Sequence, residues 1–221
     1  MTNLASYIDH TLLKPEATQS DIELLCDEAV KYRFATVCIH PSWITIAKKR
    51  LGESSVGITT VIGFPLGMTT TSTKVNETID SIKLGATEVD MVINIGELKS
   101  NNHSLVKGDI EKVVEAAKGV PVKVIIETGM LTDEEKRVAC KLAVEAGAQF
   151  VKTSTGFGPG YATVSDIELM KNIVGDQAEV KASGGVRDQE TALTMIKAGA
   201  TRIGTSSGKE ILQGTTSKTT Y

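Results

Sequence analysis

Short apolar runs alternate with longer amphipathic stretches from near the start of the chain to near its end. The later runs are rich in valine and isoleucine and lack a strict alternation with polar residues, as expected for parallel strands that helices cover. The runs predict eight strands, at Tyr7–His10, Thr36–His40, Gly57–Ile62, Glu88–Asn94, Val122–Glu127, Phe150–Thr153, Glu179–Ala182 and Thr201–Gly204.

The amphipathic stretches predict helices at Ser20–Tyr32, Lys74–Leu84, Asp109–Lys118, Asp133–Ala146, Ser165–Val174 and Asp188–Ala198. Thr132 and Ser165 are each followed by acidic residues, and both suit a helix N-terminus. Three helices are predicted to close on a glycine in the left-handed conformation just before a strand, at Gly85, Gly147 and Gly199.

Eight strands in regular alternation with helices, without a linker, predict a single (β/α)8 TIM barrel domain over residues 1–221. The count depends on the first run, Tyr7–His10, which is short. If this run is not a strand, an open doubly wound sheet becomes the alternative. That fold predicts a glycine-rich dinucleotide turn after the first strand, and the sequence lacks one.

The charge balance excludes some classes of partner. The formal net charge is -3, and the basic residues are neither in excess nor clustered, so we expect no nucleic-acid partner. No run reaches the length of a membrane span, and the first residues lack the apolar stretch of a signal peptide. We therefore expect no membrane partner.

The chain has three cysteines and three histidines, none at the spacing of a metal site. Unpaired cysteines in odd number fit a reducing compartment. We therefore expect a cytoplasmic protein without a metal or a cofactor. The residues are Cys26, Cys38, Cys140, His10, His40 and His103.

Two lysines lie in short apolar runs, each followed by small hydroxyl residues and glycine. Lys152 is in the run that begins at Phe150, and Lys181 follows Val180. A single lysine in such a place would extend its amine into water. The repeated pattern instead favours an amine nucleophile whose pKa is lowered by burial and by a cationic neighbour, because only the neutral amine attacks a carbonyl.

Barrel active sites collect at the carboxyl ends of the strands. Asp90 lies among valine, methionine and isoleucine, where a carboxylate needs a cationic partner or a proton. A purely structural ion pair is the alternative for this residue. The strand ends predict a cluster of Asp9, Cys38, Asp90 with Asn94, Glu127, Lys152 and Lys181.

Two glycine-rich turns carry a phosphate signature. Ser183–Val186 follows the seventh predicted strand, and Gly204–Gly208 follows the eighth and opens a predicted short helix. Exposed N–H groups in such turns bind phosphate, and the loops after strands seven and eight often do so in barrels. Beside two lysines, these turns predict imine chemistry on a small phosphorylated aldehyde or ketose.

Seven blocks that follow one another along the chain carry a resemblance to a known family. They are Tyr7–Pro15, Val61–Gly67, Glu88–Gly96, Val122–Thr128, Phe150–Phe157, Val180–Gly185 and Gly199–Gly208. Together they closely resemble the deoxyribose-phosphate aldolases. The resemblance implies a class I aldolase that reversibly cleaves 2-deoxyribose 5-phosphate to glyceraldehyde 3-phosphate and acetaldehyde, in deoxyribose phosphate catabolism.

The resemblance also implies roles for single residues. Lys152 would form the Schiff base, Lys181 would be its cationic neighbour, and Asp90 would transfer protons with Lys181 through water. Asp9 would belong to a supporting polar network. The implied phosphate contacts are Gly156, Gly184, Gly185, Ser206 and Ser207.

Other positions depart from the family or add to it. The loop Gly156–Tyr161 carries a proline and a tyrosine where the family loop is usually smaller, and Gly129-Met130 differs too. Cys38 aligns with a reactive-looking cysteine of many relatives, although a buried cysteine is normally a small hydrophobe. Tyr221 matches a terminal tyrosine that is thought to fold over the family's active site.

Other functions remain open from the sequence. Another imine-forming aldolase, of the transaldolase type, would share Lys152 but use a ketone donor. A catalytically silent phosphate-binding barrel would not need the buried lysines and Asp90. A metal-dependent aldolase is disfavoured because no set of histidines converges. A homodimer is compatible with the sequence, which does not separate an apolar interface from the core.

Overall fold

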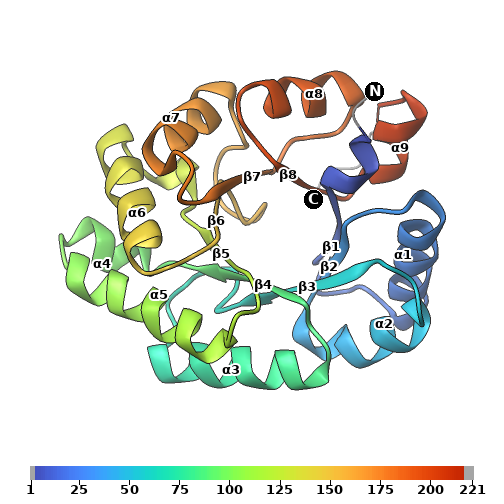
Figure 1. Cartoon of the computed structure of the whole chain (residues 1–221), viewed down its shortest axis with the longest axis horizontal. Coiled ribbons are helices and arrows are strands. Elements are labelled where there is room, and N and C mark those ends of the chain that lie inside the picture. The colour runs from blue at the N-terminus through green and yellow to red at the C-terminus, as the bar shows by residue number, and fades with distance from the viewer. Residues whose placement is uncertain (1–2, 217–221) are drawn as a thin grey trace.

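The computed structural model describes residues 3–216 as a closed barrel of eight parallel strands, with helices around the outside (Figure 1). Each strand pairs with the next one in the sequence, and the last pairs with the first. The predicted TIM barrel is confirmed. The strands are β1 (Ile8–Leu12), β2 (Thr36–Ile39), β3 (Gly57–Ile62), β4 (Glu88–Val92), β5 (Val122–Ile125), β6 (Phe150–Lys152), β7 (Glu179–Ser183) and β8 (Arg202–Thr205).

The first strand, on which the count depended, is present. It follows a 3-10 turn at Leu4–Tyr7, so it starts one residue later than predicted and runs on to Leu12. It pairs with both β2 and β8, which closes the sheet. The open doubly wound sheet is therefore wrong.

The helices are close to the predicted ones, with two additions that the sequence did not predict, α2 and α4. A capping box at Thr132 confirms the predicted helix start there. At the next helix the cap is Thr163 rather than Ser165, because the Thr163 hydroxyl accepts the Asp166 N–H. The helices are α1 (Gln19–Tyr32), α2 (Ile44–Leu51), α3 (Thr71–Leu84), α4 (Ile95–Lys99), α5 (His103–Ala117), α6 (Asp133–Glu145), α7 (Val164–Val174), α8 (Gln189–Lys197) and α9 (Gly208–Gln213).

The hydrophobic core lies mainly between the strands and the helices. In β4, Val89 and Met91 belong to this core, whereas Glu88 and Asp90 alternate with them and join polar contacts inside the barrel. Barrel interiors are usually filled by branched apolar side chains. This barrel instead encloses charged groups, which then need partners inside it.

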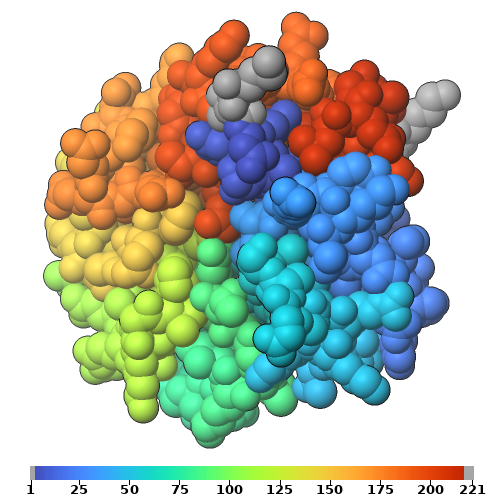
Figure 2. All heavy atoms as spheres, turned by 45° about the vertical axis from the view of Figure 1, so that its right-hand side comes forward, coloured from blue at the N-terminus to red at the C-terminus, as the bar shows by residue number. Residues whose placement is uncertain are grey.

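The two ends of the described chain meet. The turn Leu4–Tyr7 and β1 contact α9 and β8, and Figures 1 and 2 show the N-terminal segment in blue against the C-terminal segment in red. This contact completes the outer layer where the barrel closes. Within residues 3–216, no helix combines the length and the apolar character needed to cross a membrane.

Candidate active site

Asp90 is the centre of a buried charged cluster. Its Oδ2 accepts hydrogen bonds from the Nζ of Lys152 at 2.7 Å and of Lys181 at 2.8 Å. Its Oδ1 accepts a hydrogen bond from the Nζ of Lys123 at 2.9 Å. Asp90 and Lys181 are 0% exposed and Lys152 is 3% exposed. The structure thus brings together the three residues that the sequence predicts for catalysis.

The strand register explains this convergence. Lys152 is the last residue of β6 and lies opposite Lys181 of β7, so the two side chains leave the sheet on the same face. In the same way Asp90 of β4 lies opposite Lys123 of β5. Closure of the barrel then brings Asp90 and Lys123, on β4 and β5, into contact with the two lysines on β6 and β7. β6 ends at Lys152, whereas β7 continues for two residues past Lys181.

A second set of charges, which we call the floor network, lies around the first. It consists of Asp9, Glu88, Lys123 and Arg202. Arg202 donates from Nη1 to Asp9 Oδ1 at 2.7 Å and to Glu88 Oε2 at 2.9 Å. Lys123 contacts Glu88 Oε2 at 2.5 Å, and Asp9 contacts the Lys181 amine. The predicted supporting role of Asp9 thus has a geometric basis.

The sequence reasoning missed Glu88, Lys123 and Arg202. A signal for them exists, since the first and third residues of β4, Glu88 and Asp90, are charged and Lys123 interrupts the apolar run of β5. A period of two places all such residues on one face of the sheet. The face in question is the inside of the barrel.

The environment of Lys152 favours its neutral form. Burial lowers the pKa of Lys152, the Asp90 carboxylate opposes this, and the Lys181 ammonium lowers the pKa further. Desolvation is therefore the largest cause, and the cationic neighbour adds to it. The two lysines differ sharply, because the carboxylates of Asp9 and Asp90 together outweigh burial and raise the pKa of Lys181.

The charge count agrees with this assignment. The ion-paired cluster has one more basic side chain than carboxylates, so full ionisation would leave a net positive charge in a buried site. A neutral Lys152 removes this excess. The members are Lys123, Lys152, Lys181 and Arg202, with Asp9, Glu88 and Asp90.

The other predicted members take no part in the ion pairs, although Cys38 lies close enough for Lys181 and Asp90 to act on its thiol. Asn94 caps α4 by accepting the Glu97 N–H at 3.1 Å, so it serves the helix. Glu127 lies past the end of β5, where it accepts hydrogen bonds from Thr155. Cys38 is fully buried, and burial raises the pKa of its thiol, which fits a small apolar residue. Tyr221 lies outside the described residues.

The two predicted phosphate turns are neighbours. The Thr205 hydroxyl donates to the Val186 carbonyl at 2.7 Å, which ties the turn after β8 to the turn after β7. Gly184 and Gly185 have φ values of 88° and 78°, a left-handed conformation that glycine adopts without strain. Ser207 is buried and donates its N–H to Thr205, so only its hydroxyl remains as a donor for a ligand.

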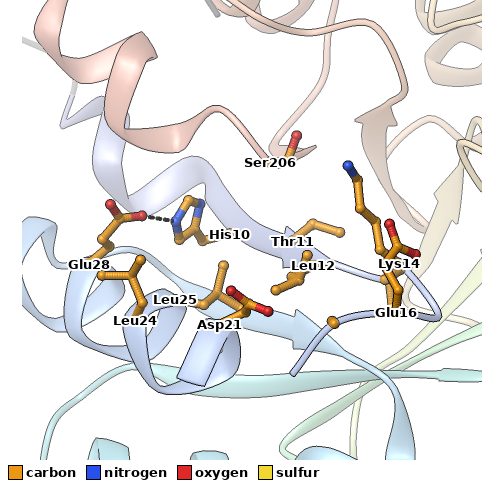
Figure 3. Close-up of a pocket in the computed structure, with 12 residues that line it drawn as sticks. His10, Thr11, Leu12, Lys14, Glu16, Asp21, Leu24, Leu25, Glu28 and Ser206 are labelled. Atoms are coloured by element: carbon orange, nitrogen blue, oxygen red, sulfur yellow. Dashed lines mark hydrogen bonds and ion pairs between the residues drawn. The ribbon is translucent and has the colours of Figure 1, made fainter. Parts of the chain in front are cut away.

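A cavity of about 380 Å³ lies between β1, the segment that follows it, and α1. Figure 3 shows Ser206 at one side of this cavity, with Lys14 extending toward the same region. His10 and Glu28 also line the cavity, with His10 Nε2 and Glu28 Oε2 2.9 Å apart. Neither Lys152 nor Lys181 lines this space, so its only link to the predicted site is Ser206.

A smaller cavity of about 250 Å³ lies beside the loop that follows Lys152. Its lining is mainly apolar, with Glu127 as the only charged side chain. Among residues 3–216, no group of three or more His, Cys, Asp or Glu side chains is arranged to hold a metal ion. The lining residues are Pro65, Leu66, Met68, Ile95, Glu127, Met130, Thr155, Phe157 and Gly158.

Comparison with known proteins identifies relatives over nearly the whole chain. Residues 3–214 match a family described as DeoC/LacD family aldolase. The chain is 58% identical to a deoxyribose-phosphate aldolase of Staphylococcus haemolyticus, over 99% of this chain and 100% of the relative. It is 57% identical to that of Carboxydothermus hydrogenoformans, over 100% of this chain and 98% of the relative.

Solved structures give the same result. The deoxyribose phosphate aldolase of Aeropyrum pernix, described as tetrameric, is 34% identical with a TM-score of 0.87, over 95% of this chain and 89% of that one. A protein called QR15, an aldolase, is 39% identical with a TM-score of 0.93, over 96% of each chain. The fold is therefore shared with these structures.

Proposed function

Because the chain belongs to the DeoC/LacD family of aldolases, we propose that it is a lyase that reversibly cleaves 2-deoxyribose 5-phosphate to glyceraldehyde 3-phosphate and acetaldehyde. In the catabolic direction, the enzyme cleaves 2-deoxyribose 5-phosphate. The observation that carries the proposal is the buried amine of Lys152, 2.7 Å from Asp90 and depressed in pKa by burial and by Lys181. Such an amine is suited to attack a carbonyl.

Lys152 acts as the nucleophile in a Schiff-base mechanism. Its neutral amine adds to the C1 aldehyde of the open-chain sugar, and loss of water gives a protonated imine. The C3 hydroxyl loses its proton, the C2–C3 bond breaks, and its electron pair passes to the imine to give an enamine. The fragment that contains C3, C4 and C5 leaves as glyceraldehyde 3-phosphate. Protonation of the enamine and hydrolysis then release acetaldehyde and Lys152.

Asp90 and Lys181 supply the proton transfers. Lys181 stays charged beside Asp9 and Asp90, because those carboxylates raise its pKa. Three lysines lower the pKa of Asp90 despite its burial, so Asp90 is ionised. An ammonium and a carboxylate that share a hydrogen bond can pass protons to and from the substrate through water.

The substrate phosphate binds at the turns after β7 and β8. Consecutive left-handed glycines present backbone N–H groups that can form an anion-binding nest. Gly156 has the same conformation, with φ of 86°. The residues proposed to contact phosphate are Gly156, Gly184, Gly185, Ser206 and Ser207.

The proposed setting is a single catalytic domain, residues 1–221, that acts in the cytoplasm on small phosphorylated substrates. It needs no metal or other cofactor, because the imine itself accepts the electrons that a metal would otherwise stabilise. Nucleic acid and membranes are not among its partners. A homodimer is the proposed assembly.

Release of acetaldehyde from 2-deoxyribose 5-phosphate tests this function. Protein dialysed against EDTA should keep its full rate, because Lys152, Asp90 and Lys181 supply the chemistry. Untreated protein from the same preparation is the control. A loss of activity that added metal restores would contradict the proposal, as would the absence of turnover in both samples.

Lys181→Leu should shift the pH dependence of kcat/KM. The Lys181 cation lowers the pKa of Lys152, so its removal should raise that pKa. Only neutral Lys152 reacts, hence activity falls as the pH drops through this pKa, and the acidic limb should move to higher pH. A pH–rate profile measures the shift, with Lys209→Leu on α9 as the control. An unchanged profile in Lys181→Leu would refute the pairing.

A further inference from the structure

Glu127 anchors the start of the loop that follows Lys152. Its carboxylate accepts the Thr155 hydroxyl at 2.5 Å and the Thr155 N–H at 3.2 Å. The Thr155 hydroxyl in turn accepts the Phe157 N–H at 3.0 Å. Glu127 is only 2% exposed, and this contact is therefore shielded from competing water. Two loops, after β5 and after β6, are joined at this point.

The backbone at Glu127 is held in an unusual conformation. Its φ of 58° and ψ of 65° lie in the left-handed region, which a residue with a side chain seldom adopts. Lys118 and Arg33 have positive φ as well, but both end a helix, where this conformation is common. Glu127 follows a strand instead. Local strain of this kind persists when surrounding contacts fix it, and it is concentrated at functional sites.

Close backbone packing keeps the two loops together. A Cβ on Gly129 would lie 1.8 Å from the Pro159 carbonyl oxygen, so only glycine allows this approach. A Cβ on Gly158 would lie 2.8 Å from the Glu127 carboxyl carbon. The loop therefore rests on Glu127 and Gly129 and has little freedom to move toward them.

The far end of the same loop lies on the turn proposed to bind phosphate. Tyr161 packs so closely on Gly185 that a Cβ there would be 2.9 Å from the Tyr161 Cβ. The Ala162 N–H donates to the Gly184 carbonyl at 3.1 Å. The guanidinium of Arg187 lies 5.8 Å from the centre of the Tyr161 ring. Tyr161 thus contacts both the glycine turn and a cation, with about half of its surface exposed (54%).

We propose that Glu127 is a positioning residue that, through Thr155, holds Tyr161 beside the Gly184–Gly185 turn and thereby sets the preference for phosphorylated substrates. The inference rests on the proposed phosphate role of that turn. Phosphate carries the negative charge that the N–H groups of the turn and nearby Arg187 recognise. A substrate without phosphate gains nothing from this arrangement.

The test compares 2-deoxyribose 5-phosphate with unphosphorylated 2-deoxyribose in the wild type and in Glu127→Gln. Glutamine keeps the shape of the side chain but removes the charge and replaces one acceptor oxygen by a donor. The ratio of the two kcat/KM values should fall by about tenfold, a factor that one lost charge-assisted hydrogen bond would produce. The change should appear in KM for the phosphorylated sugar more than in kcat.

Glu179→Gln is the matched control. Glu179 also accepts a threonine hydroxyl, that of Thr201 at 2.8 Å, but it is the first residue of β7, at the end of that strand opposite to the glycine turn. Its substitution should leave the ratio unchanged. Thr155→Val should reproduce the effect of Glu127→Gln, and Thr155→Ser, which keeps the hydroxyl, should restore the ratio. These variants keep the test valid if Glu127→Gln folds poorly.

The results of this test distinguish failure of the Glu127 proposal from failure of the proposed aldolase function. Wild-type protein that cleaves neither sugar would overturn the proposed function. Normal wild-type turnover with an unchanged ratio in Glu127→Gln and Thr155→Val would overturn the inference alone. An equal fall of the ratio in Glu179→Gln would also overturn it, because the effect would then not be specific to the loop that carries Tyr161.

Discussion

Lys152→Ala is expected to abolish cleavage of 2-deoxyribose 5-phosphate. No other amine of the cluster can replace it, because Lys123 is level with Phe150, two residues deeper than Lys152, and Lys181 is held charged by Asp9 and Asp90, which raise its pKa. Activity should fall below about one percent of wild type, which corresponds to at least about 2.7 kcal/mol of activation free energy. The rate of acetaldehyde release measures this loss.

The folded state should tolerate the same substitution. Asp90 keeps two lysine partners, Lys123 and Lys181, so no carboxylate is left unpaired. The melting temperature of Lys152→Ala should therefore stay near that of the wild type. Lys49→Ala, at an exposed position of α2, is the control for activity. Retention of more than about one percent activity in a pure Lys152→Ala sample would rule out Lys152 as the nucleophile.

Asp90→Asn is expected to reduce both stability and activity. The carboxylate is shared by Lys123, Lys152 and Lys181, and its removal leaves buried amines without an anion between them. Breaking a buried ion pair in this way typically costs about 3–5 kcal/mol of unfolding free energy. The loss of a proton-transfer group should lower kcat by about a hundredfold or more. Urea unfolding and steady-state kinetics measure the two effects.

The direction of the pH shift distinguishes this variant from Lys181→Leu. Asp90 raises the pKa of Lys152, so Asp90→Asn should lower that pKa and move the acidic limb of the remaining activity to lower pH. Lys181→Leu should move it to higher pH. The same direction of shift in both variants would contradict the assigned electrostatic roles.

Asp109→Asn provides a matched control for Asp90→Asn. Asp109 pairs with the fully buried Lys74 at 2.5 Å, between α3 and α5 and away from Lys152. Its substitution should also lower the free energy of unfolding. It should leave the pH dependence of the surviving activity unchanged, because no charge near Lys152 is altered. A shift of the pH–rate profile in Asp109→Asn would mean that general destabilisation, rather than the loss of the Asp90 charge, moves the profile.

The sequence predicts the barrel and the reactive lysines for a simple reason. Strands that are buried by helices must be apolar on the outer face, so a lysine in such a run can only point into the barrel or leave at its end. Two lysines in matching positions of consecutive strands then lie opposite each other, as Lys152 and Lys181 do. The unusual acid Asp90 completes the set by the same argument.

Three members of the floor network, Glu88, Lys123 and Arg202, escape prediction because they lie below the strand ends where barrel active sites collect. Arg202 begins β8, and Glu88 begins β4, positions that normally face solvent at the bottom of a barrel. Only closure of the sheet brings them together with Asp9 from β1. Pairing of this kind depends on barrel geometry that no local pattern encodes.

The sequence predicts the positions of loop residues less well than those of strand residues. Asn94 was expected beside Asp90, but β4 ends at Val92 and the chain turns into α4, which Asn94 caps. Glu127 was expected at the end of a strand, yet β5 ends at Ile125 and the backbone then turns to the left-handed conformation. In both cases the strand is shorter than its apolar run, which continues into the buried part of the loop.

Borohydride trapping with acetaldehyde tests the central claim most directly. Reduction of the imine should add an ethyl group of about 28 Da to the intact protein, and peptide mapping should place it on Lys152. The account predicts one adduct in the wild type and none at this position in Lys152→Ala. Folded wild-type protein that forms no adduct, or forms it only on another lysine, would contradict the account and would favour a silent phosphate-binding barrel or a different nucleophile.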